Sequence, residues 1–183
     1  MTAILPCVHS YYSLQRGVAH PLALCEAARA RGYDVLALTD TNGLYGLYPF
    51  LEACRETGLS PILGAELRTG PGVPVPGVPD CGVGASVPGA RQTGVPRAGA
   101  PARAVLLARE RSGYPTLCRA ISAYHRAARP LEKSLMGTPT VTESFDLAAH
   151  LAADHAGVVV LSDSPALVRA LRGPLGPDRL FVE

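Results

Sequence analysis

Short apolar runs alternate with amphipathic stretches along most of the chain. Six runs rich in Ile, Leu, Val and Ala are typical of buried strands. Between them, five stretches bring apolar residues to one side at helical spacing, and several begin near Pro or end at Gly, which are helix start and stop signals. The predicted strands are residues 3–8, 34–38, 61–67, 103–108, 157–161 and 179–182, and the predicted helices are residues 20–31, 44–57, 115–128, 145–153 and 165–171.

This alternation of strands and helices predicts an α/β fold with a parallel sheet. The 183 residues, 48% of them hydrophobic, suffice for a single domain over 1–183 with its own core. A parallel barrel must close on itself to remove its edges. Since the sixth strand runs to Glu183, the sequence predicts an incomplete barrel of about six strands.

Residues 70–101 contain 8 Gly and 7 Pro in 32 positions. Such a stretch holds neither a regular helix nor an interior strand. It also lacks the large apolar side chains that would offset the entropy lost on ordering. We therefore expect a mobile, Gly/Pro-rich surface loop inserted between two strands.

Charge is distributed unevenly, although the net charge is only +2. Residues 91–133 carry nine basic side chains against two acidic ones. This segment is either a weak, salt-sensitive DNA contact or a solvated linker followed by the outer face of a helix. Neither an apolar run long enough for a membrane span nor a leader is visible, which predicts a cytoplasmic protein without a membrane partner.

Polar residues stand at the ends of three predicted strands, where the reactive groups of parallel α/β sheets lie. Cys7 and His9 are two positions apart, a spacing that lets both side chains ligate one metal. Asp40 follows the next predicted strand, and Glu66 lies at the end of the one after it. Asp40 either adds a carboxylate to the same site or organises its own turn through hydrogen bonds.

Four blocks of the sequence identify a family. VHSYYSLQRG, LALTDTNGLYGLYPFLEAC, GLSPILGAEL and LLARERSGYPTLCRAISAYH resemble, in order, the N-terminal PHP (polymerase and histidinol phosphatase) domain of bacterial C-family DNA polymerases. GLYG, GAEL and ISAYH favour the error-prone branch over the DNA polymerase III alpha subunits. The resemblance covers residues 5–124 and resumes at 157–164. It implies a distorted (β/α) barrel of the PHP type whose mouth holds two or three divalent metals.

The family's metal ligands are only partly present. By the resemblance, His9 and Glu66 match two of them, and Cys7 stands where the pattern has a His. Other positions at the barrel mouth depart from the pattern: Arg16 replaces an acid, Thr41 after Asp40 replaces a His, Arg103 lies near an expected His and Ser164 near an expected Cys. A fixed positive charge at Arg16 would repel a metal ion.

We therefore expect no metal centre able to hydrolyse phosphoesters and no cofactor, with Arg16 paired to Glu66 or Asp40. The alternative is one divalent metal, zinc or manganese, held by Cys7, His9 and Glu66. The preferred hypothesis is the PHP portion of an error-prone C-family DNA polymerase, acting in DNA replication or repair. Its partners would be the rest of the polymerase or accessory proteins. Two alternatives are a stand-alone metal-dependent phosphoesterase of the histidinol-phosphatase type and a relic reading frame without a function.

Overall fold

The computed structural model describes residues 2–69, 102–128 and 145–183. The strands are β1 (Ile4–Val8), β2 (Val35–Leu38), β3 (Ser60–Thr69), β4 (Ala102–Ala108), β5 (Val158–Ser162) and β6 (Leu180–Val182). The helices are α1 (Pro21–Ala30), α2 (Leu47–Thr57), α3 (Gly113–Ala128), α4 (Leu147–Ala153) and α5 (Pro165–Leu175). All six strands belong to one sheet, in which they follow one another in sequence order.

The sheet is mixed, so the prediction of a parallel sheet was wrong at β4. β1, β2 and β3 are parallel and so are β5 and β6, but β4 runs antiparallel to both β3 and β5. Thr69 at the end of β3 pairs with Ala102 at the start of β4, so the chain leaves and re-enters the sheet at one end. A parallel neighbour would have required a crossover to the opposite end. The start of β4 therefore lies beside the carboxyl ends of the other strands.

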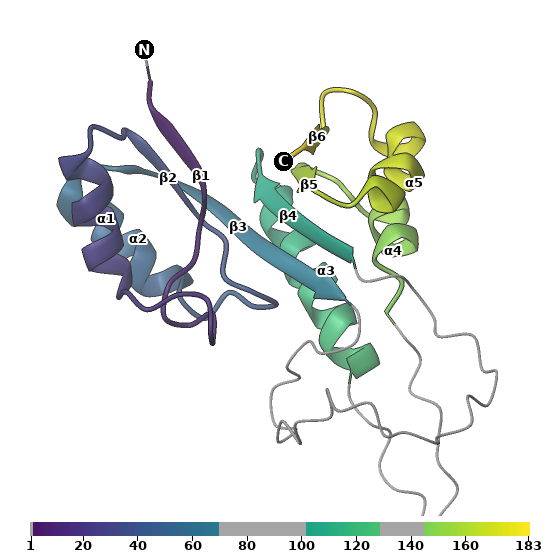
Figure 1. Cartoon of the computed structure of the whole chain (residues 1–183), viewed down its shortest axis with the longest axis horizontal. Coiled ribbons are helices and arrows are strands. Elements are labelled where there is room, and N and C mark those ends of the chain that lie inside the picture. Colours follow the sequence, from purple (N-terminus) through teal and green to yellow (C-terminus); the bar gives the residue numbers. More distant parts are fainter. Residues whose placement is uncertain (1, 70–101, 129–144) are drawn as a thin grey trace, which may run out of the picture.

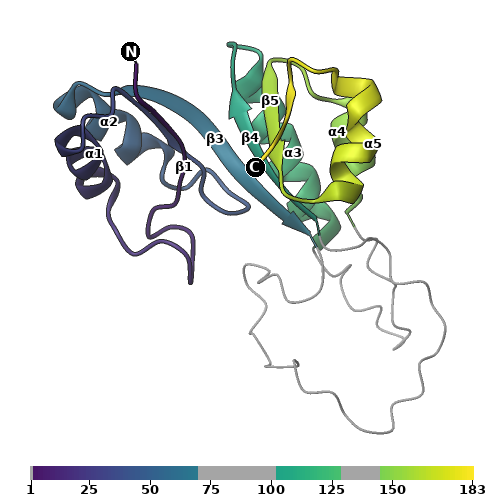
Figure 2. The same cartoon turned by 45° about the horizontal axis from the view of Figure 1, so that its top comes forward.

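Figures 1 and 2 show that the sheet curls and that the helices lie along its outer side. One core cluster packs α1 and α2 against β2 and includes Leu36 and Phe50. A second, larger cluster packs α3, α4 and α5 against β3, β4 and β5 and includes Leu106 and Leu171. The structure confirms the predicted α/β fold with a six-strand half-barrel, and β3 is the strand that connects its two halves.

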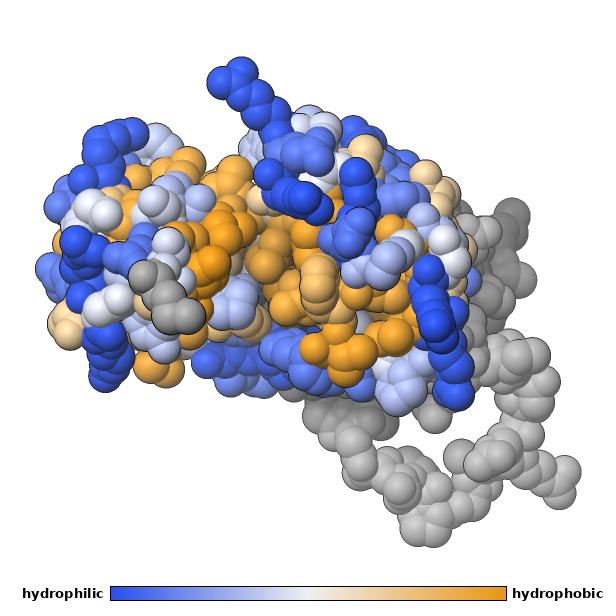
Figure 3. Space-filling model, turned by 90° about the horizontal axis from the view of Figure 1, so that it is seen from above, coloured by the Kyte–Doolittle hydropathy of each residue, from blue (hydrophilic) through white to orange (hydrophobic). Residues whose placement is uncertain are grey.

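The curled sheet is open between β1 and β6, its two edge strands. Both edges carry exposed apolar side chains, namely Ile4 on β1 and Phe181 and Val182 on β6. In Figure 3, the face seen from above has apolar side chains at its centre and hydrophilic ones around them. In the described ranges, no helix has the length and apolar character to cross a membrane.

Two expectations fall wholly or partly outside the described residues. These are the loop at residues 70–101 and the ends of the basic segment 91–133. The middle of the basic segment, residues 102–128, forms β4 and α3.

Candidate cation site at the mouth of the half-barrel

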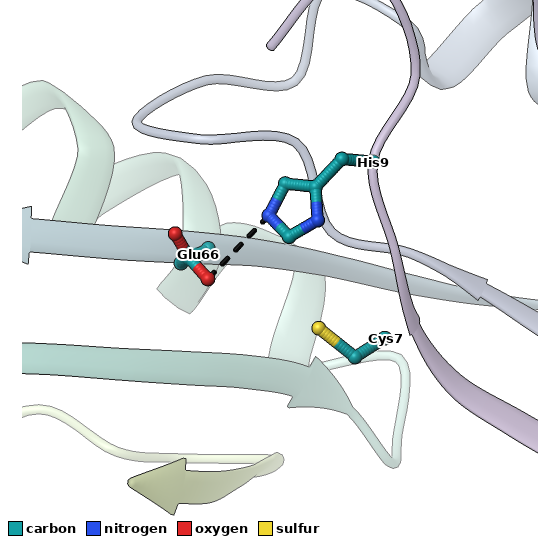
Figure 4. A group of neighbouring side chains, drawn as sticks. All are labelled: Cys7, His9 and Glu66. Atoms are coloured by element: carbon teal, nitrogen blue, oxygen red, sulfur yellow. Dashed lines mark ion pairs between the residues drawn. The ribbon is translucent and has the colours of Figure 1, made fainter. Parts of the chain in front are cut away.

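Three side chains with metal-ligand chemistry meet at the end of the half-barrel. Cys7 lies near the end of β1 and His9 directly after it, while Glu66 comes from β3 (Figure 4). One ligand atom of each lies within 4.8 Å of the others, and His9 Nε2 is 3.4 Å from Glu66 Oε2. The curl of the sheet thus brings residues about sixty positions apart into one group, as the sequence predicts for this end of the sheet.

Glu66 faces the inner side of the sheet because its neighbours face the outer core. Side chains alternate along a strand, and Ala65 and Leu67 belong to the larger core cluster. The segment after β2 fixes the backbone of Glu66 from the other side. The N–H of Glu66 donates to the carbonyl oxygen of Asp40 (3.1 Å), and the N–H of Asn42 donates to the carbonyl oxygen of Glu66 (2.7 Å). The carboxyl group is fully buried in this position.

Three arginines surround this buried carboxylate. Arg103 Nε donates to Glu66 Oε2 at 2.6 Å, Arg16 Nη1 donates to Oε1 at 3.2 Å, and Arg68 Nε also donates to Oε1. Burial alone would raise the pKa of Glu66. The contacts with His9, Arg68 and Arg103 outweigh burial and hold its pKa well below the usual range. Glu66 is therefore ionised at neutral pH and has cationic partners on both oxygens.

Arg103 makes further contacts across the mouth. Its Nη1 and Nη2 donate to the two carboxylate oxygens of Glu183, and Nη1 is 3.7 Å from Asp163 Oδ2. Its Nη2 also lies 3.8 Å from Cys7 Sγ. Burial raises the pKa of the Cys7 thiol, which favours the neutral form at pH 7. Arg103 thus touches two of the three candidate ligand atoms.

The three donors have the right chemistry for zinc, but a guanidinium group already contacts two of them. Sulfur, imidazole nitrogen and carboxylate oxygen are common zinc ligands. His9 Nε2 is buried and lies at ion-pair distance, 3.4 Å, from Glu66 Oε2, and among the described residues it makes no hydrogen bond. Glu66 Oε2 and Cys7 Sγ face Arg103 instead. With Arg103 in this position, the residues do not fit a metal ion.

Asp40 organises the loops beside the site. Its carboxylate accepts hydrogen bonds from the Ser10 N–H (2.8 Å), the Ser10 hydroxyl (2.8 Å) and the Ser13 hydroxyl (2.7 Å). A Cβ at Gly46 would lie 2.5 Å from Asp40 Oδ2, so glycine is required for this close approach. Of the two roles left open for Asp40, these contacts support the structural one.

The remaining predicted mouth residues divide into two groups. Arg16 joins Arg103 at Glu66 and is thus paired with the first of its two expected partners. Thr41 and Ser164 lie outside the group of ligand atoms. The N–H of Thr41 donates to the Ser13 hydroxyl, and the Ser164 hydroxyl caps the start of α5.

Sequence reasoning missed Arg68 and Glu183. Arg68 follows Glu66 by two positions on one strand, and this period places both side chains on the same face. That signal was available in the sequence. Glu183 lies 80 positions from Arg103, and no local pattern connects them.

Comparisons with known proteins define the family. Residues 7–172 match the family model described as PHP domain, so the chain belongs to the PHP domain family. It is 35% identical over 137 residues to the error-prone DNA polymerase of Nocardia farcinica, and this match covers 66% of this chain and 12% of the polymerase. It is 48% identical over 59 residues to DNA polymerase III subunit alpha of Halalkalibacterium halodurans, and this match covers 32% of this chain and 5% of that protein.

The chain is therefore homologous to the PHP region of these polymerases, as its motifs predict, and its matches span only 12% and 5% of their lengths. A presumed metal-dependent phosphoesterase of Bifidobacterium adolescentis has a similar structure, with a TM-score of 0.56 and 14% identity, over 100% of this chain and 77% of that one. An amidohydrolase of Chromobacterium violaceum has a TM-score of 0.53 and 15% identity, over 99% and 76%. At these identities the two likenesses show the fold alone.

Replacing Asp40 with alanine is expected to lower the free energy of unfolding by about 2–4 kcal/mol, because buried donors of Ser10 and Ser13 lose their shared acceptor. Urea unfolding of the 183-residue chain measures the change. Asp178→Ala, at an exposed position, is the matched control and should change stability by less than about 0.5 kcal/mol. Equal stability of the two variants would show that Asp40 does not hold the loops together.

Proposed function

We propose that this chain is the PHP-domain portion of an error-prone C-family DNA polymerase, acting in DNA replication or repair. The homology to error-prone DNA polymerases of Nocardia farcinica and of Anaeromyxobacter sp., the latter 34% identical over 116 residues, supports this proposal. Because the match covers 12% and 8% of those proteins, the proposed partners are the rest of such a polymerase or its accessory proteins. The proposed role is structural support or a protein contact.

We further propose that this domain has no metal-dependent hydrolase activity of its own. The observation that carries this proposal is the position of Arg103, which contacts Glu66 Oε2 and Cys7 Sγ. A metal-dependent hydrolase needs a metal ion with an open coordination position that activates water. A guanidinium group supplies positive charge and hydrogen bonds, but it does not generate a hydroxide nucleophile at neutral pH.

A DNA contact through the basic segment 91–133 stays a proposal. Two of its arginines form ion pairs within the chain: the largely buried Arg103 pairs with Glu66, and the exposed Arg119 has its Nε 2.6 Å from Asp154 Oδ2. Arg109 and Arg111 are exposed, directly after β4. Exposed arginines of this kind would give a weak contact that is sensitive to salt.

A stand-alone metal-dependent phosphoesterase is the second candidate. The convergence of the Cys7, His9 and Glu66 ligand atoms within 4.8 Å favours it. The fold likeness to the Bifidobacterium adolescentis protein fits either candidate. The two candidates differ in one measurable property, which is turnover of a phosphate ester with added metal.

The purified chain is expected to show no hydrolysis of an aryl phosphate with added Mn²⁺ or Zn²⁺ above the rate of the free metal ion. His9→Ala is the matched variant, because it removes the candidate ligand for which the described residues show no contact with Arg103. Its rate should equal that of the unaltered chain. Turnover by the unaltered chain that His9→Ala abolishes would overturn the proposal and establish the phosphoesterase.

A graft tests the polymerase relationship. When this chain replaces the PHP region of the Nocardia farcinica error-prone polymerase, we expect the chimera to extend a DNA primer. A second graft carries Phe50→Ala, which removes a fully buried ring and should cost about 3–5 kcal/mol of domain stability. It should lose extension as the domain unfolds. If both grafts are equally inactive, this chain does not act as a polymerase PHP domain.

A further inference from the structure

We infer that the guanidinium group of Arg103 takes the place of a metal ion in this half-barrel, and that removing it uncovers a zinc site formed by Cys7, His9 and Glu66. The inference rests on the geometry of the mouth, and the polymerase relationship does not enter it.

The first support is the spacing of the three donors. Ligand atoms 2.0–2.1 Å from a tetrahedral zinc ion lie about 3.3–3.4 Å from one another. His9 Nε2 and Glu66 Oε2 are 3.4 Å apart. Cys7 Sγ lies within 4.8 Å of both, so a small movement of the thiol would complete three ligands and leave the fourth position to water. Figure 4 shows the three side chains approaching one another from β1, from the segment that follows it and from β3.

The second support is the position of Arg103 among these donors. Its Nε is 2.6 Å from Glu66 Oε2, and its Nη2 is 3.8 Å from Cys7 Sγ. The other two arginines contact the opposite oxygen, Oε1. Among the described residues, Arg103 is therefore the cation that meets the same two atoms a metal would need.

The third support is that Arg103 contacts residues from several strands of the half-barrel. It starts on β4 and reaches β1 through Cys7, β3 through Glu66 and the residue after β6 through Glu183. A metal ion in such a site likewise joins ligands from several strands. The side chain of Arg103 is only 15% exposed, so a metal ion could not bind the same two atoms without bringing two poorly screened positive charges together.

The fourth support is the third candidate ligand atom, His9 Nε2, which Arg103 does not contact. His9 Nε2 is buried in the mouth and has no hydrogen-bond partner in the described part of the chain. Buried polar atoms are almost always paired, so an unpaired one needs an explanation. A guanidinium group has donors only, and Arg103 contacts the carboxylate and the thiol. The imidazole nitrogen is left with its 3.4 Å approach to Glu66 Oε2 and no hydrogen bond among the described residues. A metal ion would use all three.

Zinc titration of the 183-residue chain and its variants tests the inference, with Co²⁺ as a spectroscopic probe of thiolate coordination. The unaltered chain should compete poorly with a chromophoric chelator for Zn²⁺ and show no sulfur-to-cobalt charge-transfer band. Arg103→Ala should bind one equivalent of Zn²⁺ at least about 100-fold more tightly and show the band with Co²⁺. Arg16→Ala is the matched control: it removes an arginine from Oε1 only, and it should bind zinc as weakly as the unaltered chain.

The double variants Arg103→Ala/Cys7→Ser and Arg103→Ala/His9→Ala should lose the gained affinity, which assigns the site to these donors. Arg103→Gln is a second neutral variant that retains hydrogen-bonding groups near Glu66. It should also gain zinc binding, so the test does not depend on one variant being folded. Tight zinc binding by the unaltered chain through Cys7 and His9 would overturn the inference. So would a folded Arg103→Ala or Arg103→Gln variant with no gain.

Discussion

A fully buried carboxylate, Glu66, is the constraint on which the mouth of this half-barrel depends. A charge without a partner in the interior costs several kcal/mol. Here the carboxylate lies on β3, between the two core clusters, and Arg103 on β4 and Arg16 in the segment after β1 contact it. The backbone ladders of β3 with β2 and β4 join the two halves of the sheet, and these ion pairs add side-chain contacts across the mouth where the two halves meet. Removing one partner of such a network is more damaging than its net contribution suggests, because a buried charge is left behind.

The same carboxylate connects the fold of this PHP domain to the proposed absence of metal chemistry. A metal ion and an arginine both neutralise Glu66, but only the metal activates water. An arginine at the start of β4 preserves the charge balance and the cross-strand contacts without supplying a nucleophile. The proposal thus separates two properties of the mouth. One is the support that it gives to the fold, and the other is the chemistry that a metal ion would add there.

Much of the fold follows from the sequence, because apolar periodicity and Pro or Gly signals locate, within a few residues, the six strands and five helices of the described part of the chain. The direction of β4 does not follow, since a strand's composition is the same for parallel and antiparallel neighbours. At the site, Cys7, His9 and Glu66 come from strand-end positions and family motifs. The contact of Arg103 with Glu183 could not be predicted, because it depends on how the curl of the sheet brings β6 to β4.

The central claim is that Arg103 occupies the cation position of this mouth. Its most direct test is a crystal structure of the unaltered chain grown with Zn²⁺, with diffraction recorded on both sides of the zinc absorption edge. We expect Arg103 Nε within hydrogen-bond distance of Glu66 Oε2 and no anomalous peak near Cys7 and His9. A zinc peak bonded to Cys7, His9 and Glu66, with the Arg103 side chain turned away, would contradict the claim.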